Sequence, residues 1–264
     1  MRRNLENKKI IVTGASSGIG EKLVWHIAEN GGIPIMIARS IDKLEAQQII
    51  LEKKLQVESF VYQADLQEET ELEIVFKKIL EEHTQLHGLI NNAGVGFFDY
   101  IKDMDWQEVN QMYQLNVFAV MRTTKIMMAH FSQYNEGHII NIASQAGKIA
   151  TPRSSVYAST KHAVLGFTNG LRLENTSTNI QVTTVNLGPV RTNFFTLADP
   201  EGSYQKNVNR YMLDPDRVAK KITAVLFTNK REVNLPSWME FGSKLYHLFP
   251  SLMETILKKQ FNKK

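Results

Sequence analysis

Short apolar runs alternate with longer amphipathic segments along most of the chain. The runs predict buried strands over residues 8–13, 33–38, 57–63, 86–90, 137–143, 180–185 and 232–235. The segments between them predict helices over 21–30, 42–55, 68–83, 105–133, around Tyr157, and over 214–228. Strands that alternate with helices of this length form right-handed crossovers. We therefore expect an α/β protein with a parallel sheet and helices on both faces.

Polar and glycine residues follow these strands at their carboxyl ends. The segment TGASSGIG, with glycines at 14, 18 and 20, joins the first strand to the first helix. Backbone N–H groups and the positive end of a helix can receive a pyrophosphate there, and a side chain would obstruct it. The Gly-Lys-Ser/Thr ending of a P-loop is missing. Arg39, Asp65 and Asn91 end later strands, where parallel sheets bind ligands.

Arg39 bears on the choice of nucleotide. It lies about 20 positions beyond the glycine turn, where an acidic residue would hydrogen-bond an adenosine ribose and select NAD. A guanidinium at this place would instead bind a ribose 2′-phosphate. The alternative is a solvated arginine at a strand end.

Tyr157 and Lys161 lie four residues apart in a predicted helix, so their side chains share one face. A nearby ammonium favours the phenolate and would lower the pKa of Tyr157 from its usual value near ~10. Tyr157 would then be suited to acid–base catalysis. The same spacing also occurs by chance in surface helices, so the pair needs support from elsewhere in the chain.

Composition excludes several other functions. The chain has no cysteine, which rules out disulfides and thiol nucleophiles, and its histidines lack metal-ligand spacing. The net charge of +4 is modest and its lysines gather at the C-terminal end, so we expect no nucleic-acid partner. The basic start has neither the apolar length nor the cleavage site of a signal peptide, and no apolar run could span a bilayer. We expect a cytoplasmic protein without a metal.

Several motifs stand together in one order and spacing. They are Thr13-Gly14-x-x-x-Gly18-x-Gly20, Asn91-Asn92-Ala93-Gly94, Asn116, Ser144, Tyr157-x-x-x-Lys161 and Gly188-Pro189. On these residues the chain resembles the short-chain dehydrogenase/reductase family over roughly residues 7 to 235. The resemblance implies a single-domain, doubly wound Rossmann-like fold with about seven strands, and an NAD(P)-dependent oxidoreductase that interconverts a carbonyl and a secondary alcohol.

The resemblance also assigns roles to residues. Tyr157 would exchange a proton with the substrate oxygen, Ser144 would hydrogen-bond that oxygen, Lys161 would bind the nicotinamide ribose and lower the pKa of Tyr157, and Asn116 would hold a water of the proton relay. The expected cofactor-binding residues are Gly14, Ser16, Ser17, Gly18, Ile19, Gly20, Arg39, Asp65, Leu66, Asn92, Ala93, Gly94, Tyr157, Lys161, Gly188, Pro189, Val190 and Thr192.

The expected cofactor is NADP(H), with NAD(H) as the alternative, because Arg39 is like that of NADP-preferring members while Ser17 lacks their additional basic residue. Leu187, where members often have proline, is a minor departure. The expected substrate is a small hydrophobic ketone or ketoacyl compound, because Phe97, Phe98, Phe194, Phe195 and Leu197 stand near the site loops. A non-catalytic NADP sensor is the alternative function. The complete set Asn116, Ser144, Tyr157 and Lys161 favours the enzyme.

Residues 236–264 follow the catalytic domain expected over 1–235. Leu252, Met253, Ile256 and Leu257 fall on one helical stripe, with lysines after them. We expect a helical extension that packs on its own domain or on a second subunit of a homodimer or homotetramer. A peripheral contact with a membrane surface is the less favoured alternative.

Overall fold

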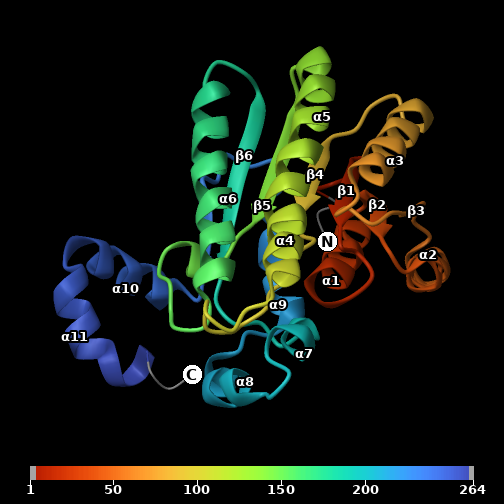
Figure 1. The fold of residues 1–264 in the computed structure, drawn as a ribbon. Coiled ribbons are helices and arrows are strands. Elements are labelled where there is room, and N and C mark those ends of the chain that lie inside the picture. Colours follow the sequence, from red (N-terminus) through yellow and green to blue (C-terminus); the bar gives the residue numbers. More distant parts are fainter. Residues whose placement is uncertain (1–3, 262–264) are drawn as a thin grey trace.

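The computed structural model describes residues 4–261, in which a parallel sheet is covered on both faces by helices (Figure 1). Within these residues the sheet has seven strands in the order β3-β2-β1-β4-β5-β6-β7, and every neighbouring pair is parallel. The strands are β1 (Lys9–Thr13), β2 (Ile33–Ala38), β3 (Phe60–Gln63), β4 (Gly88–Asn91), β5 (Gly137–Ile142), β6 (Ile180–Leu187) and β7 (Glu232–Leu235). The predicted doubly wound fold is confirmed.

The strand order reverses between β1 and β4, because the chain moves outward from β1 through β2 and β3 and then returns to the other side of β1. Open α/β sheets bind ligands in the crevice outside the carboxyl ends of the strands at such a reversal. The topology therefore locates a candidate site before any side chain is considered.

The two faces of the sheet build two separate cores. Successive residues of a strand point to opposite faces, and β1 follows this rule with Ile10 and Val12 in one core and Ile11 in the other. Helices α1 (Gly18–Glu29), α2 (Ile41–Leu55) and α9 (Pro215–Thr223) supply the first core. Helices α3 (Glu69–Glu82), α5 (Ala119–Tyr134) and α6 (Ser155–Glu174) supply the second.

The helix predicted over 105–133 is divided in the structure. It consists of α4 (Trp106–Tyr113), a π-helical turn over Gln114–Phe118 and α5. Asn116 lies in this turn with its side chain fully buried. Its amide donates to the Val95 carbonyl over 2.8 Å and to the Thr160 hydroxyl over 3.1 Å, and its Oδ1 accepts from the Val95 N–H over 2.9 Å. The π turn between α4 and α5 therefore lies where the buried Asn116 side chain makes its hydrogen bonds.

Other differences concern short elements. Helices α7 (Phe194–Ala198) and α8 (Ser203–Val208) and the 3₁₀ turns Gln145–Gly147 and Asn209–Tyr211 were not predicted. Helix α9 ends at Thr223, earlier than expected. After β7 the chain forms α10 (Ser237–Leu248) and α11 (Pro250–Phe261), which lie outside the layered domain (Figure 1). The side chain of Leu257, in the predicted stripe, lies outside the described residues. In the part of the chain described, every helix is too short or too polar to cross a membrane.

Candidate active site

The turn between β1 and α1 needs glycine at two positions. Gly14 has φ +65°, which side chains disfavour, and a Cβ there would lie 2.9 Å from Ala93 Cα. A Cβ on Gly20 would lie 2.2 Å from the carbonyl oxygen of Gly14. The backbone of this turn is therefore tightly folded at the N-terminus of α1, where N–H groups can face a phosphate.

The turn after β4 is bound to the turn after β1. The Thr13 hydroxyl accepts from the N–H groups of Asn92 and Ala93, each over 3.0 Å. The Asn92 amide donates to the carbonyl of Thr13 over 2.9 Å. These hydrogen bonds hold the two turns together at the reversal of strand order.

Ser144, Tyr157 and Lys161 come together although they derive from two elements. Ser144 follows β5, and its hydroxyl donates to the Leu187 carbonyl over 3.2 Å and accepts from the Ala146 N–H over 3.0 Å. The Ser144 side chain also hydrogen-bonds the Tyr157 hydroxyl. Lys161, one turn further along α6, is buried and donates to the Ile142 carbonyl over 3.1 Å. Its Nζ lies 5.8 Å from the centre of the Tyr157 ring.

Burial decides the protonation of this pair. It raises the pKa of Tyr157 above its usual value, although the neighbouring Ser144 side chain acts in the opposite direction. Burial also lowers the pKa of Lys161 to about 8. The expected lowering of the Tyr157 pKa is therefore wrong for the protein alone, because the loss of hydration disfavours the charged form of both groups.

A cavity of about 900 Å³ opens beside these side chains at the carboxyl ends of the strands. Its lining includes these predicted site residues: Ile19, Asn92, Gly94, Ser144, Tyr157, Lys161, Gly188, Pro189, Val190 and Thr192. The other predicted residues, Gly14, Ser16, Ser17, Gly18, Gly20, Arg39, Asp65, Leu66, Ala93 and Asn116, are outside the lining. Arg39 and Asp65 form an ion pair over 3.7 Å after β2 and β3, and the Arg39 side chain is 67% exposed.

One wall of the cavity is aromatic. The Phe98 ring centre lies 5.6 Å from that of Tyr157 and 5.2 Å from that of Tyr204, and Phe194 lies 5.7 Å from Tyr157. Phe97 and Leu197, which were also expected near the substrate, are outside the lining.

The cavity also contains residues that sequence reasoning did not assign to it. They are Gln145, Tyr204, Lys206 and Arg210 from the segments after Ser144 and Thr192, and Trp238, Met239, Gly242 and Met253 from the extension. We expected the substrate pocket to be lined by these segments, but the sequence did not identify the individual residues. Their approach to Tyr157 is set by tertiary packing, which a local pattern does not encode.

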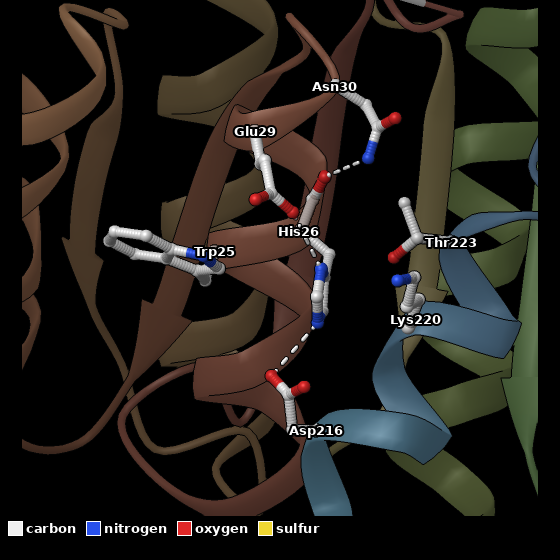
Figure 2. Close-up of a pocket in the computed structure, with 7 residues that line it drawn as sticks. All are labelled: Trp25, His26, Glu29, Asn30, Asp216, Lys220 and Thr223. Atoms are coloured by element: carbon white, nitrogen blue, oxygen red, sulfur yellow. Dashed lines mark hydrogen bonds and ion pairs between the residues drawn. The ribbon is translucent and has the colours of Figure 1, made fainter. Parts of the chain in front are cut away.

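A second cavity, of about 460 Å³, lies between α1 and α9 (Figure 2). The buried His26 ring lies 3.1 Å from a carboxylate oxygen of Glu29 and 3.0 Å from one of Asp216. Both ring nitrogens are engaged, so His26 joins the two helices. We interpret this cavity as a structural junction.

The glycine turn at the strand reversal, with a tyrosine–lysine pair beside it, defines a dinucleotide-binding class of α/β protein. Residues 8–201 match the family model described as short chain dehydrogenase. The chain is 31% identical to an NADP-dependent 3-hydroxy acid dehydrogenase of Schizosaccharomyces pombe, over 90% of this chain and 94% of the relative. It is also 31% identical to an oxidoreductase of Staphylococcus saprophyticus, over 83% of this chain and 89% of that one.

Among solved structures, an alcohol dehydrogenase from Thermococcus sibiricus complexed with 5-hydroxy-NADP matches with a TM-score of 0.79 and 26% identity, over 87% of this chain and 96% of that one. A short-chain dehydrogenase from Sphingobium yanoikuyae in complex with NADPH matches with a TM-score of 0.80 and 25% identity, over 92% and 95%. The chain belongs to the short-chain dehydrogenase/reductase family. The predicted class of enzyme, an NAD(P)-dependent dehydrogenase, is confirmed.

Proposed function

We propose that this protein is an NADP(H)-dependent oxidoreductase that interconverts a hydrophobic ketone and a secondary alcohol, with Tyr157 as the general acid and base. The observation that carries the proposal is that Ser144, Tyr157 and Lys161 converge on the wall of one cavity, next to the aromatic ring of Phe98.

Reduction of a carbonyl builds negative charge on its oxygen, which requires a hydrogen-bond donor and a proton. The Ser144 hydroxyl is the donor, and Tyr157 supplies the proton. Tyr157 carries its proton at neutral pH, and the ammonium of Lys161 would favour the phenolate that remains after the proton is transferred. Lys161 would bind the nicotinamide ribose, and Asn116 keeps the segment at Val95 in place through two hydrogen bonds.

The glycine turn and the strand ends fit a dinucleotide. The predicted cofactor-binding residues would hold it, with the pyrophosphate against the turn of Gly14 to Gly20 and the adenosine ribose near Arg39. NADPH, when bound, supplies the hydride. The exposed guanidinium of Arg39 suits a 2′-phosphate. The similar proteins named for NADP or complexed with it support the same preference.

The substrate would contact the wall formed by Phe98, Phe194 and Tyr204, which favours an apolar group next to the carbonyl. Lys206 and Arg210 also line the cavity, and none of its described lining residues is acidic. These two cations favour a ketoacyl or keto acid substrate as the second candidate. The name of the fission yeast relative, a 3-hydroxy acid dehydrogenase, points the same way.

We further propose a catalytic domain over 1–235 with the extension 236–264, and a homodimer or homotetramer in the cytoplasm. The lack of cysteine fits a reducing compartment. Trp106 and Leu173 expose 68% and 70% of their surface, on α4 and α6, and could be covered by another subunit. Light scattering would measure the mass of the assembly.

The test is a turnover screen of apolar ketones and keto acids with NADPH and NADH, made with the wild type and Tyr157→Phe. We expect turnover by the wild type and a loss of about 10²–10⁴-fold in kcat for Tyr157→Phe, with NADPH binding retained, because only the proton-transferring hydroxyl is removed. Tyr134→Phe, on α5, is the matched control. NADPH binding without any turnover by the wild type would instead indicate the non-catalytic sensor.

A further inference from the structure

The extension presents apolar side chains to solvent. Phe241 and Leu248 lie on one face of α10 and are 73% and 71% exposed. Trp238, at the start of the helix, instead lies beside Tyr211 in the lining of the large cavity. Ser243, on the opposite side of the helix, is only 2% exposed. A helix packed on its own domain shows the reverse arrangement, with polar side chains outside. The domain of the same chain therefore leaves the outward face of α10 uncovered.

Apolar side chains are also exposed beyond α10. Phe249, between the two helices, and Leu252 and Ile256, one turn apart on α11, are 54%, 57% and 63% exposed. We call the five side chains of Phe241, Leu248, Phe249, Leu252 and Ile256 the outer face of the extension. Figure 1 shows α10 and α11 as an angled pair beside the domain. Large exposed apolar patches on soluble domains mark surfaces that bind a partner.

The inner side of α10 is bound to the domain by ion pairs, so the outer face points away from the domain. Lys148 is only 12% exposed and contacts carboxylates of Glu240 on α10 and Glu232 on β7, the latter over 2.9 Å. Met239 and Gly242 of α10 line the large cavity. The extension is therefore a wall of the candidate active site on one side and an apolar surface on the other.

The charge of the extension indicates which kind of partner binds its outer face. Residues 236–264 contain five lysines and two glutamates, so they carry +3 of the net charge of +4. Both glutamates are engaged, Glu240 with Lys148 and Glu254 with the Tyr246 hydroxyl over 2.8 Å. A symmetric contact with a second copy would bring two such positive segments together. An anionic surface would instead attract them.

We propose that the outer face of the extension docks onto the surface of a bilayer that contains anionic lipids. Phenylalanine, leucine and isoleucine on one face, in a segment whose sequence is rich in lysine, are the composition of helices that lie in the membrane interface. Docking would hold the cavity next to the lipid phase. Membrane binding is measured without turnover, so its test does not depend on whether the proposed reaction is correct.

The test is co-sedimentation of the full chain with phosphatidylcholine vesicles, with and without about one third phosphatidylglycerol. We expect binding to the anionic vesicles that weakens at high salt. Phe241→Ser/Ile256→Ser should weaken it at least about tenfold, since both side chains are exposed and their loss removes apolar contact without disturbing the core. Ile74→Ser on α3 is the matched control, because Ile74 and Ile256 are each 63% exposed, and it should bind as the wild type does.

Two results would overturn the proposal. One is a wild type that stays in the supernatant with anionic vesicles, or a double variant that sediments with them as well as the wild type. The other is a double variant that, without vesicles, shows half the wild-type mass in light scattering. That result would assign the outer face to a subunit interface.

Discussion

Arg39→Asp is the sharpest test of the nucleotide preference. Arg39 follows β2 at the carboxyl edge of the sheet, and its guanidinium lies 3.7 Å from the carboxylate of Asp65. A 2′-phosphate carries close to two negative charges, whereas NAD has a neutral hydroxyl there. The substitution removes the cation, introduces repulsion toward the phosphate and offers NAD a ribose acceptor.

The exposure of Arg39 sets the size of the effect. A hydrogen bond to a charged group contributes about 1.5–3 kcal/mol. Because the Arg39 side chain is 67% exposed, water screens it and the lower value applies. Repulsion between screened charges adds about 1 kcal/mol. At about 1.4 kcal/mol per decade, the ratio of kcat/KM for NADPH to that for NADH should fall roughly tenfold to a hundredfold.

Steady-state kinetics with both cofactors measures this ratio. Arg39→Ala should show the smaller part of the fall, since it removes the cation without adding repulsion. Lys77→Asp, on α3 and 79% exposed, makes the same charge change elsewhere and should leave the ratio unchanged. A wild type that prefers NADH, or a ratio unaffected by Arg39→Asp, would refute the assignment of Arg39.

Two further predictions concern buried positions. Burial lowers the pKa of His138 to about 3, and the His138 ring accepts a hydrogen bond from the Phe227 N–H over 2.8 Å. The folded protein therefore keeps His138 neutral, whereas in the unfolded chain the same ring is protonated below a pH of about 6.5. The contribution of His138 is complete above that pH and falls by about 1.4 kcal/mol per unit below it. Burial also lowers the pKa values of His83, His87 and His130, so denaturant unfolding at pH 5 should give at least about 2 kcal/mol less than at pH 7, and equal values would contradict this. Gly20→Ala should abolish NADPH binding, measured by fluorescence, because its Cβ would meet the Gly14 carbonyl at 2.2 Å. Gly170→Ala, with nothing within 4 Å of its Cβ, should bind normally.

The sequence was sufficient for the sheet and the helices that cover it, because strands such as β1 and β2 are continuous apolar runs buried on both faces. It also indicated which strand ends meet, since parallel strands place their carboxyl ends at one edge. Local patterns did not predict α7 and α8, which are too short for a helical period and take their form from packing around Phe195 and Tyr204.

The protonation of the tyrosine–lysine pair was also beyond the sequence. The spacing of Tyr157 and Lys161 indicated that they share a helix face, as they do on α6. The spacing carries no information on hydration, and burial is the largest cause of the pKa shift of each residue. A pKa depends on the whole surroundings of a group, while spacing reports only one neighbour.

The π turn at Gln114–Phe118 constrains how this chain can vary in length. Such a turn holds one residue more than a turn of α-helix. Deleting a single residue here would restore a continuous α-helix and leave α5 close to its present rotation, because the π turn already absorbs the additional residue. A deletion within α5 itself would instead rotate the following residues by about 100° and turn Met127 and Phe131, now buried against the sheet, away from it. Changes of length in this helix are therefore compatible with the core only at the turn, where they would disturb the hydrogen bonds of Asn116.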